Sequence, residues 1–193
     1  MILFYLFIFF VVYLINVIPA FMPGTWMVLA YFKIKYNSPI YILAIIGAIA
    51  ATLGRVTLSL LSRDFFRPFF SKKMQENMDH LGKMIDRIKG WTIPLMFTYA
   101  FFPVPSNQVF IALGLARVRI RLVAISFFLG RLVSYSFWVF TANYVADNLE
   151  GVFTWELTRG QKIIGEIFSF ILLFLFLRID WLALVKERKL KLI

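Results

Sequence analysis

Long apolar stretches separated by short polar segments dominate the chain. The first of them, residues 1–32, carries no charged side chain. As a single helix it would extend ~48 Å, whereas the hydrocarbon core of a bilayer is only about 30 Å thick. Pro19 and Pro23 lie near its middle, and proline removes a backbone donor and clashes with the preceding turn. The pattern therefore predicts a spanning helix over residues 1–18, followed by a re-entrant half-helix within residues 19–32.

A second charge-free stretch, residues 90–116, is interrupted in the same way. It contains Pro103 and Pro105, and the apolar runs on either side are each too short to cross a bilayer. We therefore expect a second re-entrant segment over residues 91–116. Three longer apolar runs predict further spanning helices, over residues 40–62, 120–146 and 163–185.

The polar segments between these runs are mostly basic. Residues 63–90 hold seven Lys or Arg and four Asp or Glu, and their apolar side chains recur at helical spacing, as in amphipathic helices at a membrane interface. Because basic loops stay on the cytoplasmic side, we expect residues 63–90, residues 117–121 and the basic tail to lie there. The protein is then integral to the plasma membrane, with both termini on the cytoplasmic side. Lys33 and Lys35 would lie on the outer side, which is the one exception to the preference of basic residues for the cytoplasm.

The overall composition also indicates a membrane protein. Of the 193 residues, 61% are hydrophobic, against about 45–50% in ordinary soluble domains. The net charge is +11, but the basic residues flank apolar runs, so we expect membrane lipids and not nucleic acid as partners. The predicted fold class is an all-α polytopic membrane domain over residues 1–193. It has about four spanning helices, two inverted re-entrant helical hairpins and interfacial amphipathic helices.

The two halves of the chain follow the same order of elements. Leu53-Gly54-Arg55 recurs as Leu129-Gly130-Arg131, each inside a predicted span that follows a proline break. This repeat divides the domain into a first half-repeat at 1–62, an amphipathic linker at 63–90, a second half-repeat at 91–146, and a last loop, span and tail at 147–193. An inverted repeat of this kind places the binding site of a transporter near the membrane midplane. Coincidence in a chain rich in leucine and glycine is the alternative.

The most informative polar residues are two arginines inside predicted spans. Burying arginine in a bilayer costs at least ~2.5–3.5 kcal/mol, so Arg55 and Arg131 need an anion, carbonyl groups or water around them. A phosphate-bearing lipid head group is a ligand that guanidinium groups and half-helix N-termini would hold. The alternatives are an ion pair with Glu166, which is also the one candidate proton carrier, and snorkelling of Arg55 to the interface.

Polar side chains also flank both proline breaks. They are Asn16 and Thr25 at the first break, and Ser106, Asn107 and Gln108 at the second; Pro19, Pro23, Gly24, Pro103 and Pro105 form the breaks themselves. Non-helical backbone inside a membrane is tolerated only where protein or water satisfies it. These side chains therefore either line a polar path for a head group or satisfy freed backbone groups.

Catalysis and metal binding find little support in the sequence. The chain has no cysteine and a single histidine, His80, in a polar stretch. The absence of cysteine excludes thiolate chemistry, and a single histidine argues against a histidine-based metal cluster or catalytic triad. We expect no enzymatic activity, no metal site and no cofactor.

The motifs around the two breaks resemble those of a known family, the DedA/VTT (SNARE-associated) membrane proteins. The first half matches through Pro19 to Gly24, then Gly47 and Leu53-Gly54-Arg55; the second matches through Phe101 to Ser106, then Ala112-Leu113-Gly114 and Gly130-Arg131. The resemblance covers residues 14–140, and the Pro-Val-Pro-Ser form is closer to archaeal and eukaryotic-type members. It implies two re-entrant hairpins that face each other inside a small helical bundle. Family members are linked to the movement of phospholipids or polyprenyl phosphates between leaflets.

The chain departs from the bacterial members, some of which depend on the proton motive force. Those proteins carry acidic residues beside the first break, where this chain has Ile15, Asn16 and Thr25, and arginines near the second, where it has Ala100 and Ser106. The resemblance therefore implies uncoupled, scramblase-like movement of an anionic lipid. Transport of a small solute or ion, and a structural or assembly role without transport, stay open, as does formation of a homo-oligomer.

Overall fold

The computed structural model describes residues 1–19, 24–102 and 106–148, together with Ile167, Ile171, Phe174, Leu175 and Arg178. Within these residues the chain is helical and contains no strand. The helices are α1 (Ile2–Val17), α2 (Thr25–Tyr36), α3 (Ile40–Leu61), α4 (Lys72–Arg87), α5 (Lys89–Phe101), α6 (Asn107–Leu115) and α7 (Ile120–Asn148). A π-helical turn at Ser62–Phe66 and a 3₁₀ turn at Arg67–Phe69 continue α3. The all-α prediction is confirmed for the described residues.

Two of the described segments are long and apolar enough to cross a membrane. They are Ile40–Phe69, which contains α3, and Ile120–Tyr144 within α7. The expected span over residues 1–18 is a shorter apolar helix, since α1 has 16 residues. The expected span over residues 163–185 lies mostly outside the described residues. The described part thus holds two spanning candidates.

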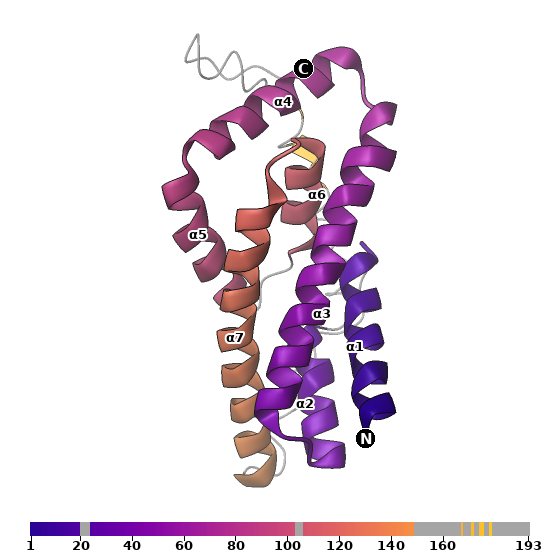
Figure 1. Cartoon of the computed structure of the whole chain (residues 1–193), viewed down its shortest axis with the longest axis vertical. Helices are drawn as coiled ribbons and strands as arrows, with labels where there is room; N and C mark the ends of the chain where they lie inside the picture. Colours follow the sequence, from indigo (N-terminus) through magenta and orange to yellow (C-terminus); the bar gives the residue numbers. More distant parts are fainter. Residues whose placement is uncertain are drawn as a thin grey trace.

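The two long helices form the centre of the molecule (Figure 1). α3 packs against α7, α1 packs along α3, and α5 packs along α7. The short helices cross over, because α2 packs mainly against α7 and α6 mainly against α3. Each half of the chain therefore contributes one helix to its own long helix and one to the long helix of the other half.

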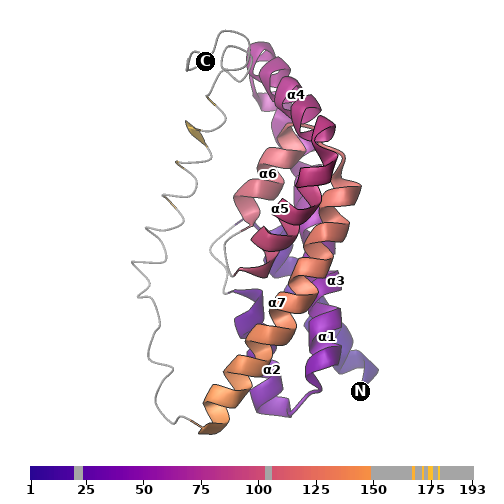
Figure 2. The ribbon, with the colours of Figure 1, turned by 90° about the vertical axis from the view of Figure 1, so that its left-hand side faces the viewer.

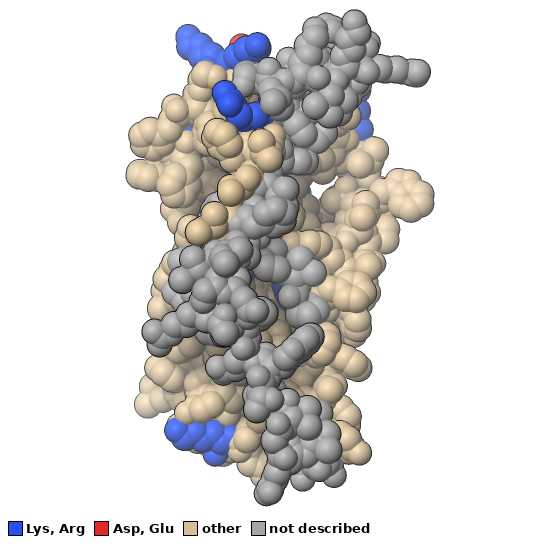
Figure 3. Space-filling view, turned by 180° about the vertical axis from the view of Figure 1, so that it is seen from behind, with Lys and Arg blue, Asp and Glu red and all other residues tan. Residues whose placement is uncertain are grey.

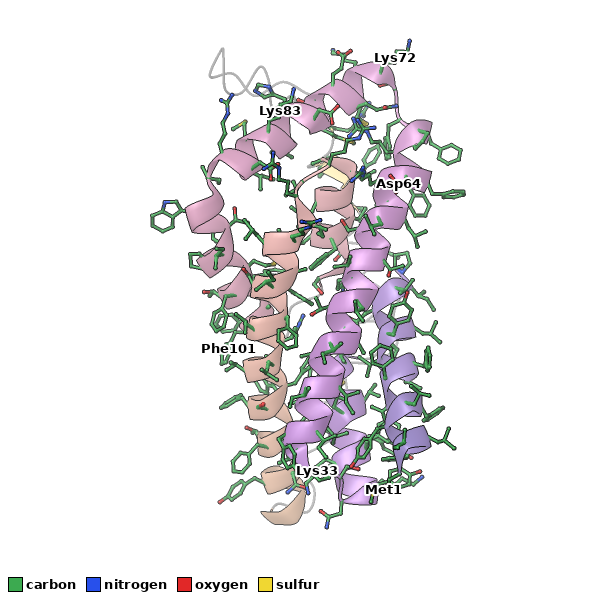
Figure 4. The ribbon with its side chains drawn as sticks, in the orientation of Figure 1. Met1, Lys33, Asp64, Lys72, Lys83 and Phe101 are labelled. Carbon is green, nitrogen blue, oxygen red and sulfur yellow. The ribbon has the colours of Figure 1, made fainter. Side chains whose placement is uncertain are left out.

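The helix pairs enter from opposite ends of the long helices (Figures 1 and 2). Figure 4 places Met1 and Lys33 at one end, and Lys72 and Lys83 of α4 at the other. The expected placement of Met1 and the linker 63–90 on one side of a membrane does not fit this arrangement. The physical reason is that α1 ends partway along α3 and the chain then returns through α2 to the end at which it began.

Small side chains on α3 allow the central helices to approach closely. Ala44, Ala48 and Ala51 are fully buried, and a Cβ added at Gly47 would lie 2.5 Å from Leu29 Cδ1 of α2. Small residues at helix contacts are the usual means by which apolar helices pack in lipid. They explain how α2 can reach across α3 to α7.

The amphipathic linker helix α4 turns its apolar face inward. Met78 and Leu81 are buried, and Met78 packs with Leu115 at the end of α6. A Cβ added at Gly82 would collide with the carbonyl oxygen of Ala116. The apolar face that the sequence assigned to the membrane interface is therefore covered by α6, while the polar face of α4 points outward.

Candidate functional site

Arg55 lies inside the helix bundle and holds the end of α1. The residue is 7% exposed, and its Nη1 donates a hydrogen bond to the carbonyl oxygen of Asn16 at 3.0 Å. Asn16 belongs to the last turn of α1, where carbonyl groups lack partners within the helix. The helix ends there because Pro19 disfavours helical backbone in the residue before it. A cation at this position also complements the negative end of the helix dipole.

Arg131 occupies the corresponding place in the second half. It is 7% exposed, and its Nη1 lies 3.5 Å from the carbonyl oxygen of Phe102, the residue that caps the C-terminus of α5. Its guanidinium carbon lies 5.0 Å from the ring centroid of Phe127 and 5.6 Å from that of Tyr135. Cation–π contacts of this kind favour the charge in a site with little water.

The glycine before each arginine explains why Gly-Arg recurs. A Cβ added at Gly54 would lie 2.7 Å from the carbonyl oxygen of Tyr13 on α1. A Cβ added at Gly130 would lie 2.6 Å from the carbonyl oxygen of Phe97 on α5. In both halves, the glycine therefore lets a short helix lie directly on a long one, and the arginine reaches the carbonyl groups at the end of that short helix.

Both arginines influence one residue of α5 electrostatically. The hydroxyl of Tyr99, on α5, interacts electrostatically with both Arg131 and Arg55. Two cations from different halves of the chain are thus within electrostatic range of one partly buried hydroxyl group. Both residues that the sequence singled out are buried in the described bundle, and their role as an anion-binding pair stays a prediction.

The polar residues of the first break hold each other. Asn16 Nδ2 donates to the carbonyl oxygen of Val12 at 2.8 Å and to Thr25 Oγ1 at 2.9 Å. These bonds join the end of α1 to the first residue of α2. Gly24 opens α2, because its carbonyl oxygen accepts from the amides of Met27 and Val28. In this arrangement Asn16 bonds the backbone of α1, and Thr25 accepts a bond from the Asn16 side chain.

The polar residues of the second break are less fully engaged. Ser106 is 1% exposed, and its Oγ has no hydrogen-bond partner among the described residues; the same holds for Gln108 Nε2. Asn107 is also buried, at the first position of α6. An unsatisfied buried polar atom costs about 1–3 kcal/mol. A bound polar group here would therefore stabilise the site.

Three buried polar atoms were not identified from the sequence. They are Thr52 Oγ1 on α3 and Ser134 Oγ and Trp138 Nε1 on α7, each without a hydrogen-bond partner within the described part of the chain. Serine in apolar helices usually donates to a carbonyl one turn back, as Ser126 and Ser136 do here. Nothing in the sequence distinguishes Ser134 from those two residues.

The N-termini of both short helices lack side-chain caps. Neither Gly24 before α2 nor Ser106 before α6 caps the first turn through its side chain. The free amide groups and the helix dipole make such ends favourable for an anion. Arginine side chains, uncapped helix N-termini and unsatisfied polar atoms together can hold a phosphate-like group.

Several predicted site residues lie outside the described residues, namely Pro23, Pro103, Pro105 and Glu166. The ion pair with Glu166 therefore stays a prediction. Among the residues that the structure describes, no group of His, Asp or Glu is arranged to hold a metal ion. The resemblance to the DedA/VTT family also stays a prediction carried by its motifs. Comparison of the chain with protein-family models, with curated proteins and with solved structures found no match.

Proposed function

We propose that the chain is a membrane transporter of the DedA/VTT type. It moves an anionic lipid, either a phospholipid or a polyprenyl phosphate, between leaflets in a scramblase-like manner without proton coupling. The observation that carries this proposal is the pair of buried arginines, Arg55 and Arg131, which lie at equivalent places in the two halves, each beside the C-terminal end of a short helix. Burial of two cations in an apolar helical bundle is costly, and such residues usually mark the path of an ion or substrate.

The placement in the membrane follows from helix lengths and surface character. α3 and α7 cross the bilayer, while α1 with α2 and α5 with α6 enter from opposite sides as re-entrant hairpins. On the face that Figure 3 shows, most of the described surface between the two ends is uncharged. The end with α4 is cytoplasmic, because it carries most of the basic residues. Met1 then faces the other side.

A lipid phosphate would compete well with the present partners of the arginines. Guanidinium groups bind phosphate through two parallel, charge-assisted hydrogen bonds, which are about twice as strong as bonds to neutral acceptors. The 3.5 Å contact of Arg131 with Phe102 is long for a hydrogen bond and is therefore easily exchanged. Ser106 and Gln108 supply further polar atoms at the start of α6. The acyl chains would remain among the apolar side chains of the bilayer.

The direct test is lipid movement in reconstituted vesicles. Full-length protein is placed in liposomes whose labelled phospholipid is accessible to a membrane-impermeant quencher in one leaflet only. We expect faster loss of fluorescence than in empty vesicles, and a reduction of about tenfold or more for Arg131→Ala, because a charge-assisted bond to phosphate contributes about 1.5–3 kcal/mol. Lys35→Ala, at an exposed cation in the last turn of α2, is the matched control. Movement no faster than in empty vesicles, or equally fast with Arg131→Ala, would refute the proposal.

A structural role is the second candidate, and one observation favours it. Arg55 already has a well-formed bond to the carbonyl oxygen of Asn16, which holds α1 on α3. If this is its whole role, Arg55→Ala will lower the melting temperature while lipid movement by the folded fraction equals that of the wild type. Uptake of a small solute or ion without lipid movement would instead favour the solute transporter.

A further inference from the structure

One end of the molecule, here called the basic end, carries most of the exposed basic side chains. They come from three segments: Arg63 after α3, Lys72, Lys73, Lys83 and Arg87 on α4, and Arg117, Arg119 and Arg121 around the start of α7. Figure 4 shows Lys72 and Lys83 at this end, and Figure 3 shows basic side chains gathered at the tips of the molecule. Segments far apart in the sequence thus build one positive surface.

The acidic residues of the basic end do little to neutralise it. Three carboxylates are engaged in ion pairs: Asp64 with Arg63 at 3.3 Å, Asp86 with Arg119 at 3.7 Å, and Asp79 with the buried Arg67 at 2.7 Å. The remaining exposed cations lie outside these described ion pairs: Lys72, Lys73, Lys83, Arg87, Arg117 and Arg121. Among the described residues, one further carboxylate belongs to these segments, that of Glu76. The surface therefore keeps a large positive charge.

Exposed aromatic side chains border the basic end. Phe65, Phe66 and Phe69 project from the turns that close α3, and Phe69 is 79% exposed. Trp91, in the first turn of α5, is 72% exposed. Large apolar side chains beside lysine and arginine are typical of a surface that sits in the head-group region of a bilayer.

The backbone at Arg117 gives an independent indication that the charge is used. Arg117 has φ 55°, in the left-handed region. Its amide donates to the carbonyl oxygen of Gly114, and the amide of Val118 donates to that of Leu113, which is the Schellman pattern that ends a helix. Glycine usually occupies this position because it has no Cβ to strain. An exposed arginine is unfavourable for the backbone at this position. We take this cost as an indication that the positive charge of the side chain has a function.

We propose that the basic end binds the anionic head groups of the leaflet that it faces and enriches acidic phospholipid around the protein. The aromatic side chains lie at the boundary of the hydrocarbon, and the lysines and arginines lie at the level of the phosphates. Each basic residue near an acidic membrane surface strengthens binding roughly fivefold, and salt screens the effect. The proposal goes beyond lipid movement, because it concerns the surface of the protein and holds with or without transport.

The chain allows a site-specific test because it has no cysteine. A donor dye is attached to the full-length protein through Gly90→Cys, next to Trp91, where nothing lies within 4 Å of an added Cβ. A second labelled protein, Tyr41→Cys, carries the dye on an exposed position near the start of α3, toward the opposite end. The proteins are reconstituted in vesicles of phosphatidylcholine with a minor fraction of phosphatidylglycerol in both leaflets. Because both leaflets have the same lipid composition, movement of lipid between them does not change the measured enrichment.

The measured quantity is energy transfer to acyl-labelled phosphatidylglycerol relative to acyl-labelled phosphatidylcholine. From Gly90→Cys we expect a local enrichment of phosphatidylglycerol of about threefold or more at low salt, which falls toward one in about 0.5 M salt. We expect a smaller enrichment from Tyr41→Cys. Replacing Lys72, Lys73, Lys83 and Arg87 together by Gln should bring the ratio at Gly90→Cys close to one.

The matched control removes two charges at the opposite end, Lys33→Gln with Lys35→Gln. The hydrogen bond that Lys35 donates to the Tyr31 hydroxyl raises the pKa of Lys35 above its ordinary value. This variant should leave the enrichment at Gly90→Cys unchanged. Equal transfer to both lipids at low salt, enrichment that survives the fourfold replacement, or the same loss with the control would overturn the proposal. An acidic protein as the true partner would give the first of these results. The salt dependence measured with labelled Gly90→Cys alone tests the idea without any charge-removing substitution.

Discussion

Adding a single methyl group at Gly54 tests the role assigned to the Gly-Arg pairs. In Gly54→Ala, the new Cβ would lie 2.7 Å from Asn16 Cβ and 2.7 Å from the carbonyl oxygen of Tyr13. Ordinary contact begins at about 3.5 Å, so α1 has to move away from α3 by roughly 1 Å. The 3.0 Å bond from Arg55 to Asn16 would then approach 4 Å, beyond hydrogen-bond distance.

The expected free-energy change combines three contributions. Loss of a hydrogen bond to a charged group costs about 1.5–3 kcal/mol, and overpacking costs about 1–3 kcal/mol. Replacement of a helical glycine by alanine returns about 0.5–1 kcal/mol. Gly54→Ala should therefore lower the free energy of unfolding by about 1.5–5.5 kcal/mol.

Equilibrium unfolding of the full-length protein in mixed detergent, followed by circular dichroism, measures this change. Gly90→Ala is the matched control, because nothing lies within 4 Å of a Cβ at Gly90 and the helix should gain stability. The double variant Gly54→Ala with Arg55→Met should be less destabilised than the sum of the single variants, since both lose the same bond. The proposed coupling between Gly54 and Arg55 is refuted if Gly54→Ala unfolds like the wild type. It is also refuted if the free-energy changes of Gly54→Ala and Arg55→Met simply add in the double variant.

Three further predictions concern the basic end and are checked by the same unfolding measurement. Arg67→Ala breaks the ion pair with Asp79 and the bond to the Leu115 carbonyl oxygen; we expect a loss of about 2–3 kcal/mol, less than for a fully buried pair because Asp79 is partly exposed. Arg117→Gly should stabilise the protein by about 1 kcal/mol in neutral detergent, since φ is 55° there, and a destabilised variant would contradict this. Ser71→Ala should cost about 1 kcal/mol and speed amide exchange at Met74, whose amide donates to Ser71 Oγ, whereas Ser71→Thr should not.

Local rules let the sequence determine much of this protein. Charge-free stretches of limited length predict apolar helices, and proline positions predict where those helices end, because both depend on hydrophobicity and backbone geometry near each residue. The recurrence of Gly54-Arg55 as Gly130-Arg131 is visible in the sequence alone and marks the two arginines that the bundle buries. The energetic need of a buried arginine for partners also follows from the residue alone.

Only the tertiary structure decided which partners those residues find. The sequence could not choose between Glu166, a lipid phosphate and backbone carbonyl groups for Arg55, because that choice depends on which helix end lies beside it. The crossing of α2 to α7 and of α6 to α3, the return of the chain after α1, and the cover of α4 by α6 also depend on contacts between distant segments. Apolar periodicity fixes that a helix face is buried, whereas the identity of the surface that buries it is settled by the shape of the whole bundle.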